Sequence, residues 1–276
     1  MAMEINFWTS TEFVRGSYDE AKGVWNAVVR RGDGSERTLH PRHLVFANGL
    51  VGEAHIPELP GLKDFKGDAM HTTAFTNGAN WRGKKALVIG TGTSGHDVAQ
   101  DLHANGVDTT IVQRGATMVL SIDPSAKLTY GIYNGLPIED GDLLAATNTK
   151  PMVKKNLQTI TKRMLENDKK IIEGLIARGF KFTDGEDGAG HQWMVRTRYG
   201  GYYLDGGCSQ LIIDGEIGLL HYENIDRFVA NGALMKDGTV KQADLIVLAT
   251  GFVPQEMVVV LGEAVGLVAD VLEQPQ

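Results

Sequence analysis

The chain has 276 residues, of which 42% are hydrophobic and 22% charged, and its formal net charge is −7. This composition is typical of a globular protein with one or two modest domains. The acidity, and the absence of any run of Lys and Arg, argue against a nucleic-acid-binding protein. No apolar run reaches the ~18 residues that a membrane span requires. The N-terminal sequence MAMEINFWTS also lacks the basic start and apolar core of a secretory signal.

Cysteine and metal-ligand patterns point to a reducing environment without a metal site. Cys208 is the only cysteine, which excludes an internal disulfide and a CxxC redox pair. We therefore expect a cytoplasmic protein, with Cys208 as a small buried hydrophobic residue rather than a nucleophile. No zinc-ligand spacing and no Gly-x-Ser-x-Gly nucleophile motif appears, so no metal and no acid–base or nucleophilic catalytic residue is assigned.

The first 62 residues predict a small antiparallel β-meander followed by a linker. Three short segments have strand composition, and a Gly-Asp-Gly turn separates the last two: Glu12–Val14, Val24–Val29 and Arg37–Leu39. His43–Gly49 is predicted to be a further apolar strand that ends in a small-residue turn. The two prolines of Glu53–Gly61 then predict an extended linker.

The stretch Lys84–Arg114 predicts a complete strand, glycine turn, helix and second strand. Gly90, Gly92 and Gly95 follow the first strand at G-x-G-x-x-G spacing. In such a unit the first glycine allows the tight turn, the second lets a pyrophosphate approach the backbone, and the third lets helix and strand pack closely. The sequence therefore predicts a dinucleotide site formed by the whole turn, Gly90, Thr91, Gly92, Thr93, Ser94 and Gly95.

The residues that close the second strand favour NADP(H) over NAD(H). NAD sites usually carry an acidic residue there to bind the ribose hydroxyls, whereas this chain has Gln113 and Arg114. A guanidinium can pair with the 2′-phosphate of NADP through two parallel hydrogen bonds. Arg114 as an ordinary solvated charge is the alternative interpretation.

The segment from about 123 to 203 does not fit a simple dinucleotide-binding unit. Met152–Arg178 predicts one long amphipathic and basic helix, whose charges we interpret as a solvated face. Gly200–Tyr203 predicts a flexible turn, and Cys208–Ile213 predicts one helical turn before the apolar Leu219–Leu220. A second meander is predicted after residue 222, with strands at Ile225–Val229 and Ala233–Met235 that lead into an apolar strand at Asp244–Phe252.

Two further motifs resemble those of the flavin-containing monooxygenase family. FKGDAMHTTAF matches the pattern FxGxxxHxxx(Y/F) through Phe65, Gly67, His71 and Phe75, and it lies just before the glycine motif, as it does in that family. LATGF, with Ala249, Thr250 and Gly251, resembles the second shared motif, where the chain leads back into the flavin domain. The related Baeyer–Villiger enzymes carry Trp where Phe75 stands, which favours the N- and S-oxygenating branch or its bacterial relatives.

The resemblance implies an α/β fold with a Rossmann-like NADP-binding domain inserted between parts of an FAD-binding domain. The expected division is residues 1–62 and 223–276 for the flavin-domain parts, with the NADP-binding domain at 63–222. In such enzymes NADPH reduces FAD, and O2 then oxygenates a soft nitrogen, sulfur or carbonyl group of a small organic substrate. We expect His71 and Phe75 to be positioning residues, and Ala249–Gly251 to belong to the cofactor-binding set.

Departures from the family pattern leave the function of the isolated chain open. Asn48 replaces the Thr of the first "ATG" turn, and Thr93 replaces a common Asn. No glycine motif for the FAD pyrophosphate is found in residues 1–42, so FAD binding by this chain is doubtful and the chain resembles the middle of such an enzyme. The alternatives are a non-catalytic NADP-binding protein and an NADPH-dependent flavoprotein reductase or dehydrogenase without oxygenation.

Overall fold

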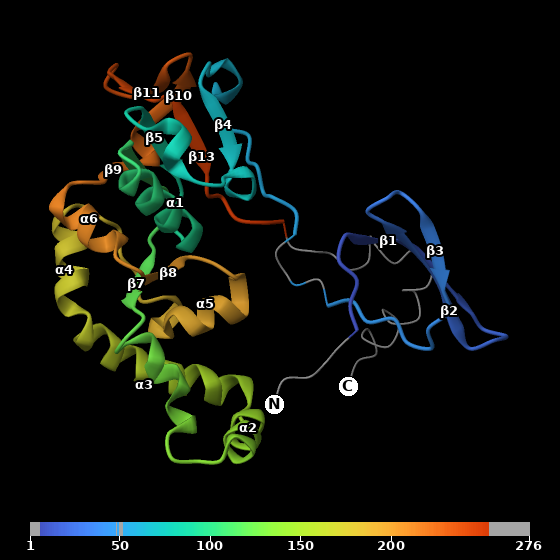
Figure 1. The fold of residues 1–276 in the computed structure, drawn as a ribbon. Helices are drawn as coiled ribbons and strands as arrows, with labels where there is room; N and C mark the ends of the chain where they lie inside the picture. The colour runs from blue at the N-terminus through green and yellow to red at the C-terminus, as the bar shows by residue number, and fades with distance from the viewer. Residues whose placement is uncertain (1–5, 48, 50–51, 254–276) are drawn as a thin grey trace. The chain divides into compact units, whose positions relative to one another are not determined.

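The computed structural model describes residues 6–47, 49 and 52–253 (Figure 1). The chain divides into two compact units, one formed by Met1–Glu53 and Phe252–Gln276 and the other by Ala54–Gly251. Within the part of the chain that the structure describes, no helix has the length and apolar character to cross a membrane.

The described part of the first unit is an antiparallel meander, as the sequence predicts. Its strands are ordered β1-β2-β3, with β1 at Thr11–Asp19, β2 at Val24–Arg31 and β3 at Glu36–Leu39. The turn between β2 and β3 is closed by Asp33, whose carboxylate accepts hydrogen bonds from the backbone N–H and the hydroxyl of Ser35. This is the Asx-turn chemistry that makes Asp frequent in tight turns.

The predicted strand at His43–Gly49 is not formed in residues 43–47. An apolar sequence becomes a strand only beside another strand that can satisfy its backbone groups, and no described strand pairs with this segment. Val45 is consequently 80% exposed. Asn48, the predicted departure from the family turn, lies outside the described residues.

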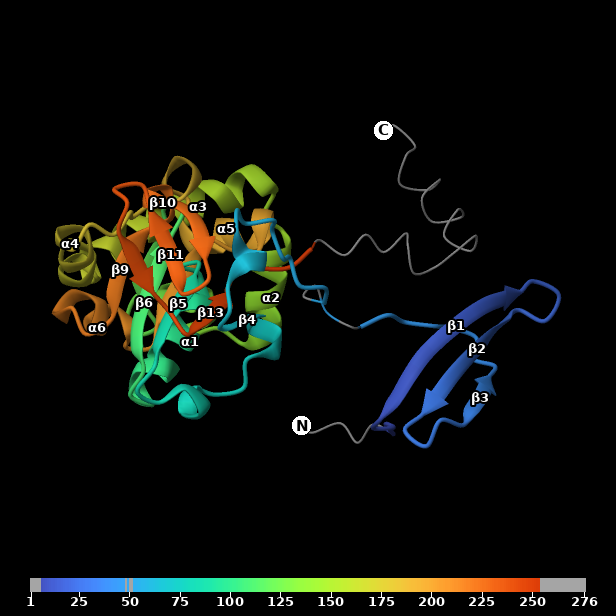
Figure 2. The ribbon, with the colours of Figure 1, turned by 90° about the horizontal axis from the view of Figure 1, so that it is seen from above.

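The second unit is built on a five-stranded parallel sheet in the order β4-β13-β5-β6-β9 (Figure 2). From one edge to the other, the strands are β4 Asp68–His71, β13 Leu245–Leu248, β5 Lys85–Ile89, β6 Asp108–Gln113 and β9 Gly218–His221. From β5 the chain continues to β6 on one side, whereas β13 arrives from the distant C-terminal part on the other. This makes the β5–β13 boundary a topological switch point, where open α/β sheets bind their ligands.

Both faces of this sheet are covered. Alternate residues of β5 point to opposite sides, so Ala86 and Val88 join a core with the helices, and Leu87 and Ile89 join a core with the second meander. The helices of the first layer are α1 at Thr93–Ala104 and α6 at Cys208–Asp214. The meander of the opposite layer consists of β10 Ile225–Val229, β11 Gly232–Met235 and β12 Val240–Gln242. The α/β three-layer prediction is confirmed.

The helical segment after β6 has its own small core. Two short parallel strands, β7 at Met118–Ser121 and β8 at Tyr202–Asp205, pack against α3 at Lys150–Asn167 and α5 at Gly190–Arg198. The segment also contains α2 at Ile138–Ala146 and α4 at Lys169–Ala177. Short 3-10 helices complete the chain: Leu62–Asp64, Thr72–Ala74, Gly78–Trp81, Ala126–Tyr133, Glu186–Gly188 and Tyr222–Asn224.

Two predictions for this segment are wrong. The single long helix over Met152–Arg178 is two helices, α3 and α4, which meet at the buried Asp168. The carboxylate of Asp168 accepts a hydrogen bond of 2.9 Å from the backbone N–H of Ser121, so a tertiary contact redirects the chain where periodicity alone would continue it. Of the predicted turn at Gly200–Tyr203, the two glycines lie outside any strand, but Tyr202 and Tyr203 begin β8, because β7 offers an edge with which they pair.

The second meander belongs to the second unit. Phe228 and Ala233 are buried against the parallel sheet, so the division of the chain falls at residues 53/54 and 251/252, whereas the expected boundaries lie at 62/63 and 222/223. The assignment of the two units to flavin and NADP domains stays a prediction.

Candidate dinucleotide site

The turn between β5 and α1 is one in which two of the three glycines cannot be replaced without a clash. Gly90 has a φ of +123°, and a Cβ there would lie 2.3 Å from the carbonyl oxygen of Ala249. A Cβ on Gly95 would lie 2.1 Å from the carbonyl oxygen of Gly90. Both contacts are with backbone, which has little room to yield. These glycines therefore allow β13, the turn and α1 to pack together as the motif predicts.

Gly92 differs from its two neighbours because a Cβ there would meet nothing within 4 Å. It is the N-cap of α1, its φ is −78°, and no side chain caps the helix. The first backbone N–H groups of a helix have no intrahelical acceptor, and the helix dipole adds partial positive charge at this end. An open backbone approach to such an end fits the pyrophosphate of a dinucleotide.

The remaining residues of the turn divide into anchors and exposed positions. The hydroxyls of the buried Thr91 and Thr117 share a hydrogen bond of 2.7 Å. The hydroxyl of Thr93 donates to the carbonyl oxygen of Tyr202 at 3.3 Å, which ties α1 to β8. Ser94 is exposed. Thr91 and Thr93 thus hold the turn in place through their side chains, and Ser94 faces solvent.

The end of β6 separates Gln113 from Arg114. Gln113 is fully buried, and its amide exchanges two hydrogen bonds with the backbone of Lys181: the Nε2 donates at 3.0 Å and the Oε1 accepts at 2.7 Å. Its side chain is therefore committed to the fold. Arg114 is exposed and forms no ion pair with any residue that the structure describes. Its charge is accordingly available to a ligand at the carboxyl end of the sheet.

The LATGF segment follows β13 at the same edge of the sheet. The carbonyl oxygen of Gly251 accepts from the backbone N–H of His55 at 3.0 Å, and the hydroxyl of Thr250 donates to the carbonyl oxygen of His55 at 2.6 Å. Ala249 lies directly against Gly90. This segment is thus the structural wall of the glycine turn.

The four residues of the FxGxxxHxxxF pattern have distinct packing roles around β4. Phe65 is buried in the core below the second meander. A Cβ on Gly67 would lie 2.3 Å from the carbonyl oxygen of Asp244, so only glycine lets the chain pass the start of β13 so closely. Phe75 packs on the other side of the sheet and stacks on Trp81, with ring centroids 6.0 Å apart. The pattern therefore joins both faces of the sheet.

His71 links this pattern to LATGF. It is 4% exposed and stands opposite Leu248 in the β4–β13 pairing. Its Nδ1 accepts a hydrogen bond of 3.2 Å from the backbone N–H of Thr73, so the proton resides on Nε2, which donates to the carbonyl oxygen of Gly251 at 2.9 Å. The arrangement supports a positioning role, because the ring holds the turn after β13.

His96 on α1 is a residue that sequence analysis passed over. It is fully buried, its Nδ1 lies 3.1 Å from the carbonyl oxygen of Gly92, and its ring stacks on Tyr203 with centroids 4.0 Å apart. Burial lowers its pKa to about 4, so the ring is neutral near pH 7. The signal that could reveal it is a histidine on the apolar stripe of a helix directly after a glycine motif.

Cys208 is fully buried, as predicted, and burial raises the pKa of its thiol to about 12. A thiol with this pKa stays protonated and is not a nucleophile. Among residues 6–47, 49 and 52–253, no group of three or more His, Cys, Asp or Glu side chains could hold a metal ion.

Comparison with known proteins places this geometry in a family. Residues 2–261 match the profile described as flavin-binding monooxygenase-like. The chain belongs to this family. It is 30% identical to a probable indole-3-pyruvate monooxygenase, YUCCA7 of Arabidopsis thaliana, over 85% of the chain and 51% of that relative. It is 27% identical to dimethylaniline monooxygenase [N-oxide-forming] 2 of Cavia porcellus, over 90% of the chain and 43% of that relative.

Solved structures share the fold. The chain matches an ε-caprolactone-bound cyclohexanone monooxygenase with a TM-score of 0.58 and 19% identity, over 88% of the chain and 54% of that structure. It matches OTEMO in complex with FAD and NADP with a TM-score of 0.57 and 16% identity, over 88% and 53%. The chain thus spans about half the length of the relatives it matches.

Proposed function

We propose that residues 54–251 bind NADP(H) at the β5–α1 turn, within an NADPH- and FAD-dependent monooxygenase that oxygenates a soft nitrogen, sulfur or carbonyl group. The observation that carries the proposal is a contrast within the turn. A Cβ on Gly90 or Gly95 would clash with backbone atoms, whereas a Cβ on Gly92 would meet no atom within 4 Å. The membership in a flavin monooxygenase family and the names of the relatives support the type of reaction.

The residues of the turn and of the β6 end would divide the recognition of NADP(H) between them. The backbone N–H groups after Gly92 would donate to the pyrophosphate, and the guanidinium of Arg114 would pair with the 2′-phosphate. His71 and the wall formed by Ala249–Gly251 would keep the turn in position. When bound, the nicotinamide supplies the hydride for reduction of the flavin.

The flavin is assigned no pyrophosphate-binding residues in this chain. Among the residues that the structure describes, β5 and α1 form the strand–glycine turn–helix unit with G-x-G-x-x-G spacing, and the proposal gives it to NADP(H). The alternative supported by this observation is an NADP(H)-binding protein without turnover. The visible spectrum of the purified chain separates the two, because a flavoprotein is yellow and the alternative is colourless.

Nucleotide titration followed by fluorescence tests the NADP(H) site. Wild type should bind NADPH more tightly than NADH, and Arg114→Ala should lose about tenfold in NADPH affinity while its NADH affinity stays unchanged. Arg82→Ala is the matched control, because Arg82 is also exposed and lies before β5, at the opposite end of the same sheet. Equal affinity for the two nucleotides, or full NADPH affinity in Arg114→Ala, would contradict the assignment.

The oxygenation step has its own assay. Substrate-dependent oxidation of NADPH with matching O2 uptake, measured across an amine, a sulfide and a ketone, is expected if the chain and its flavin act as a monooxygenase. NADPH binding without such uptake would support the non-catalytic alternative.

A further inference from the structure

A groove of about 560 Å³ opens in the helical segment between the start of α3 and the end of α5. We call it the α3–α5 groove. Its walls are apolar and aromatic, formed by Val153, Trp193, Val195 and Tyr199, and its cationic side chains are Lys150 and Arg196. Small-molecule sites commonly have volumes of about 300–1,000 Å³, with mostly apolar walls and a few polar groups.

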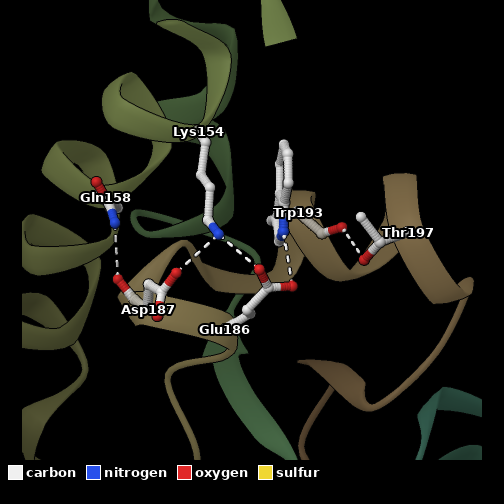
Figure 3. Close-up of polar contacts among 6 residues, drawn as sticks. All are labelled: Lys154, Gln158, Glu186, Asp187, Trp193 and Thr197. Atoms are coloured by element: carbon white, nitrogen blue, oxygen red, sulfur yellow. Dashed lines mark hydrogen bonds and ion pairs between the residues drawn. The ribbon is translucent and has the colours of Figure 1, made fainter. Parts of the chain in front are cut away.

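A hydrogen-bonded network fixes the aromatic wall of the groove (Figure 3). The ammonium group of Lys154 donates to Glu186 at 2.6 Å and to Asp187 at 2.8 Å, and the other oxygen of Glu186 accepts from the indole N–H of Trp193 at 3.2 Å. Trp193 is 6% exposed. The hydroxyl of Thr197 donates to the Trp193 carbonyl oxygen at 2.8 Å. The wall is therefore preorganised rather than a mobile surface ring.

Backbone strain is concentrated around the same groove. Three residues other than glycine have positive φ in the described part of the chain, and two of them are Asp187 and Tyr199, each with φ of 52°. Asp187, in the left-handed conformation, pairs with Lys154 through its carboxylate. Tyr199, also left-handed, ends α5 and lines the groove as a residue that is 65% exposed. Strain of this kind persists where surrounding contacts impose it, and it is frequent at ligand sites.

The two cationic side chains that line the groove have no ion-pair partner among the residues that the structure describes. Glu186 and Asp187 both pair with Lys154, whereas Lys150 and Arg196 form no such pair. No Asp or Glu is among the lining residues. The Lys150 ammonium lies 5.8 Å from the centroid of the Trp193 ring, so this charge sits over the aromatic wall.

We propose that the α3–α5 groove binds a small organic anion, a carboxylate attached to a planar aromatic body. The carboxylate would pair with Arg196 and Lys150, and the ring would pack against Val153 and Val195 beside Trp193. The groove shares no residue with the dinucleotide site, so this binding is independent of NADP(H).

Isothermal titration calorimetry with benzoate on the full chain tests the proposal. Benzamide serves as the neutral analogue of the same shape, and acetate as the anion without a ring. Benzoate should bind wild type with a dissociation constant below about 10 mM, and both analogues should bind at least about tenfold more weakly. Arg196→Gln and Lys150→Gln should each weaken benzoate by about tenfold.

Matched controls come from the exposed face of α3. Lys155→Gln and Arg163→Gln remove a lysine and an arginine that do not line the groove, and they should leave benzoate binding unchanged. Absence of benzoate binding, equal binding of benzamide or acetate, or an equal loss in the two controls would each overturn the proposal. Arg114→Ala should retain benzoate binding whatever its effect on NADPH, so failure of the dinucleotide assignment stays distinguishable.

Discussion

The dinucleotide turn and the α3–α5 groove differ in the chemical groups that would bind a ligand. In the turn the functional groups are backbone amides, and Gly90 and Gly95 are glycines because a Cβ would strike a carbonyl oxygen. In the groove the functional groups are side chains, and Lys154 reaches Glu186 and Asp187 across 32 and 33 residues of sequence. A site made of backbone amides can be recognised from the spacing of its glycines in the sequence. A site made of side chains forms only when the fold brings distant residues together.

The difference predicts how each region responds to mutation. Substitutions in the turn meet main chain that cannot move aside, so stability falls wherever a Cβ clashes. Substitutions in the groove change exposed or half-exposed polar groups, whose contribution to stability is small because water and salt screen them. Four experiments follow from this contrast.

Replacement of Gly95 by Ala should have the largest effect. Its Cβ would lie 2.1 Å from the Gly90 carbonyl oxygen, and the required shift of α1 away from β5 should lower the free energy of unfolding by about 3–4 kcal/mol. Urea denaturation followed by circular dichroism measures the change.

Gly83→Ala is the control for this substitution. Gly83 also has a positive φ, of +74°, but a Cβ there meets nothing within 4 Å. The control should therefore cost only the backbone strain of about 1 kcal/mol. Equal losses at the two positions would show that the close packing of helix and strand is not what the third glycine provides.

The buried His96 should make the same region sensitive to acid. Its pKa is about 4 in the folded chain and 6.5 as an ordinary histidine, because burial disfavours the charged ring. The unfolded chain therefore binds more protons between these values, and stability falls as the pH falls from 6.5 to 4. The loss attributable to this group should reach about 3 kcal/mol at pH 4.

The comparison with His96→Phe isolates this contribution. The phenyl ring keeps the stack on Tyr203 but carries no titratable nitrogen, while the nearby Asp97, Asp205 and Cys208 are unchanged. Denaturation at pH 7 and pH 4 should show the wild type losing about 3 kcal/mol more than the variant over this range. Parallel losses in the two proteins would show that His96 does not titrate in this interval.

The same contrast explains what the sequence could predict. The β5–α1–β6 unit and the two meanders follow from local periodicity and glycine spacing. The break at Asp168 could not be predicted, because it depends on a hydrogen bond to Ser121 from a strand 47 residues away. The strand expected at His43–Gly49 is not formed in residues 43–47 for the complementary reason: the sequence is apolar, but no described strand pairs with it.

Within the candidate site, the sequence located the turn but not the function of each side chain. Gln113 ends the strand, where a cofactor residue is expected, yet both polar atoms of its amide bond the backbone of Lys181. His96 shows in the sequence only as a histidine on the apolar stripe of the helix, and its stacking on Tyr203 depends on the fold. Contacts with residues that are distant in sequence, Lys181 and Tyr203, decide the two cases.

Gly92→Ala should separate binding from stability. A methyl group at this position meets no protein atom within 4 Å and the φ of −78° suits alanine, so the free energy of unfolding should change by less than about 0.5 kcal/mol. The methyl group would occupy the space through which the pyrophosphate approaches the amides, and NADPH affinity should fall by about tenfold, or about 1.4 kcal/mol.

Fluorescence titration and urea denaturation of the same Gly92→Ala preparation measure the NADPH affinity and the free energy of unfolding. Unchanged NADPH affinity would place the pyrophosphate elsewhere.

Removal of the lysine from the groove network, Lys154→Met, should have the smallest effect on stability. The carboxylates of Glu186 and Asp187 are 62% and 68% exposed, so salt screens their attraction to Lys154. The hydrogen bond from Lys154, then the hydrogen bond from Trp193 and the charge of Lys154, lower the pKa of Glu186 below its ordinary value of 4.5. The contribution of this network is therefore present above pH 4.5 and lost as the pH falls through the lowered pKa of Glu186.

The melting temperature of Lys154→Met should be slightly below that of wild type at pH 7 and low salt, and the two should coincide in about 1 M NaCl or at a pH below the pKa of Glu186. A difference that persists in high salt would mean that Lys154 acts through the packing of its methylene groups on Trp193 rather than through its charge.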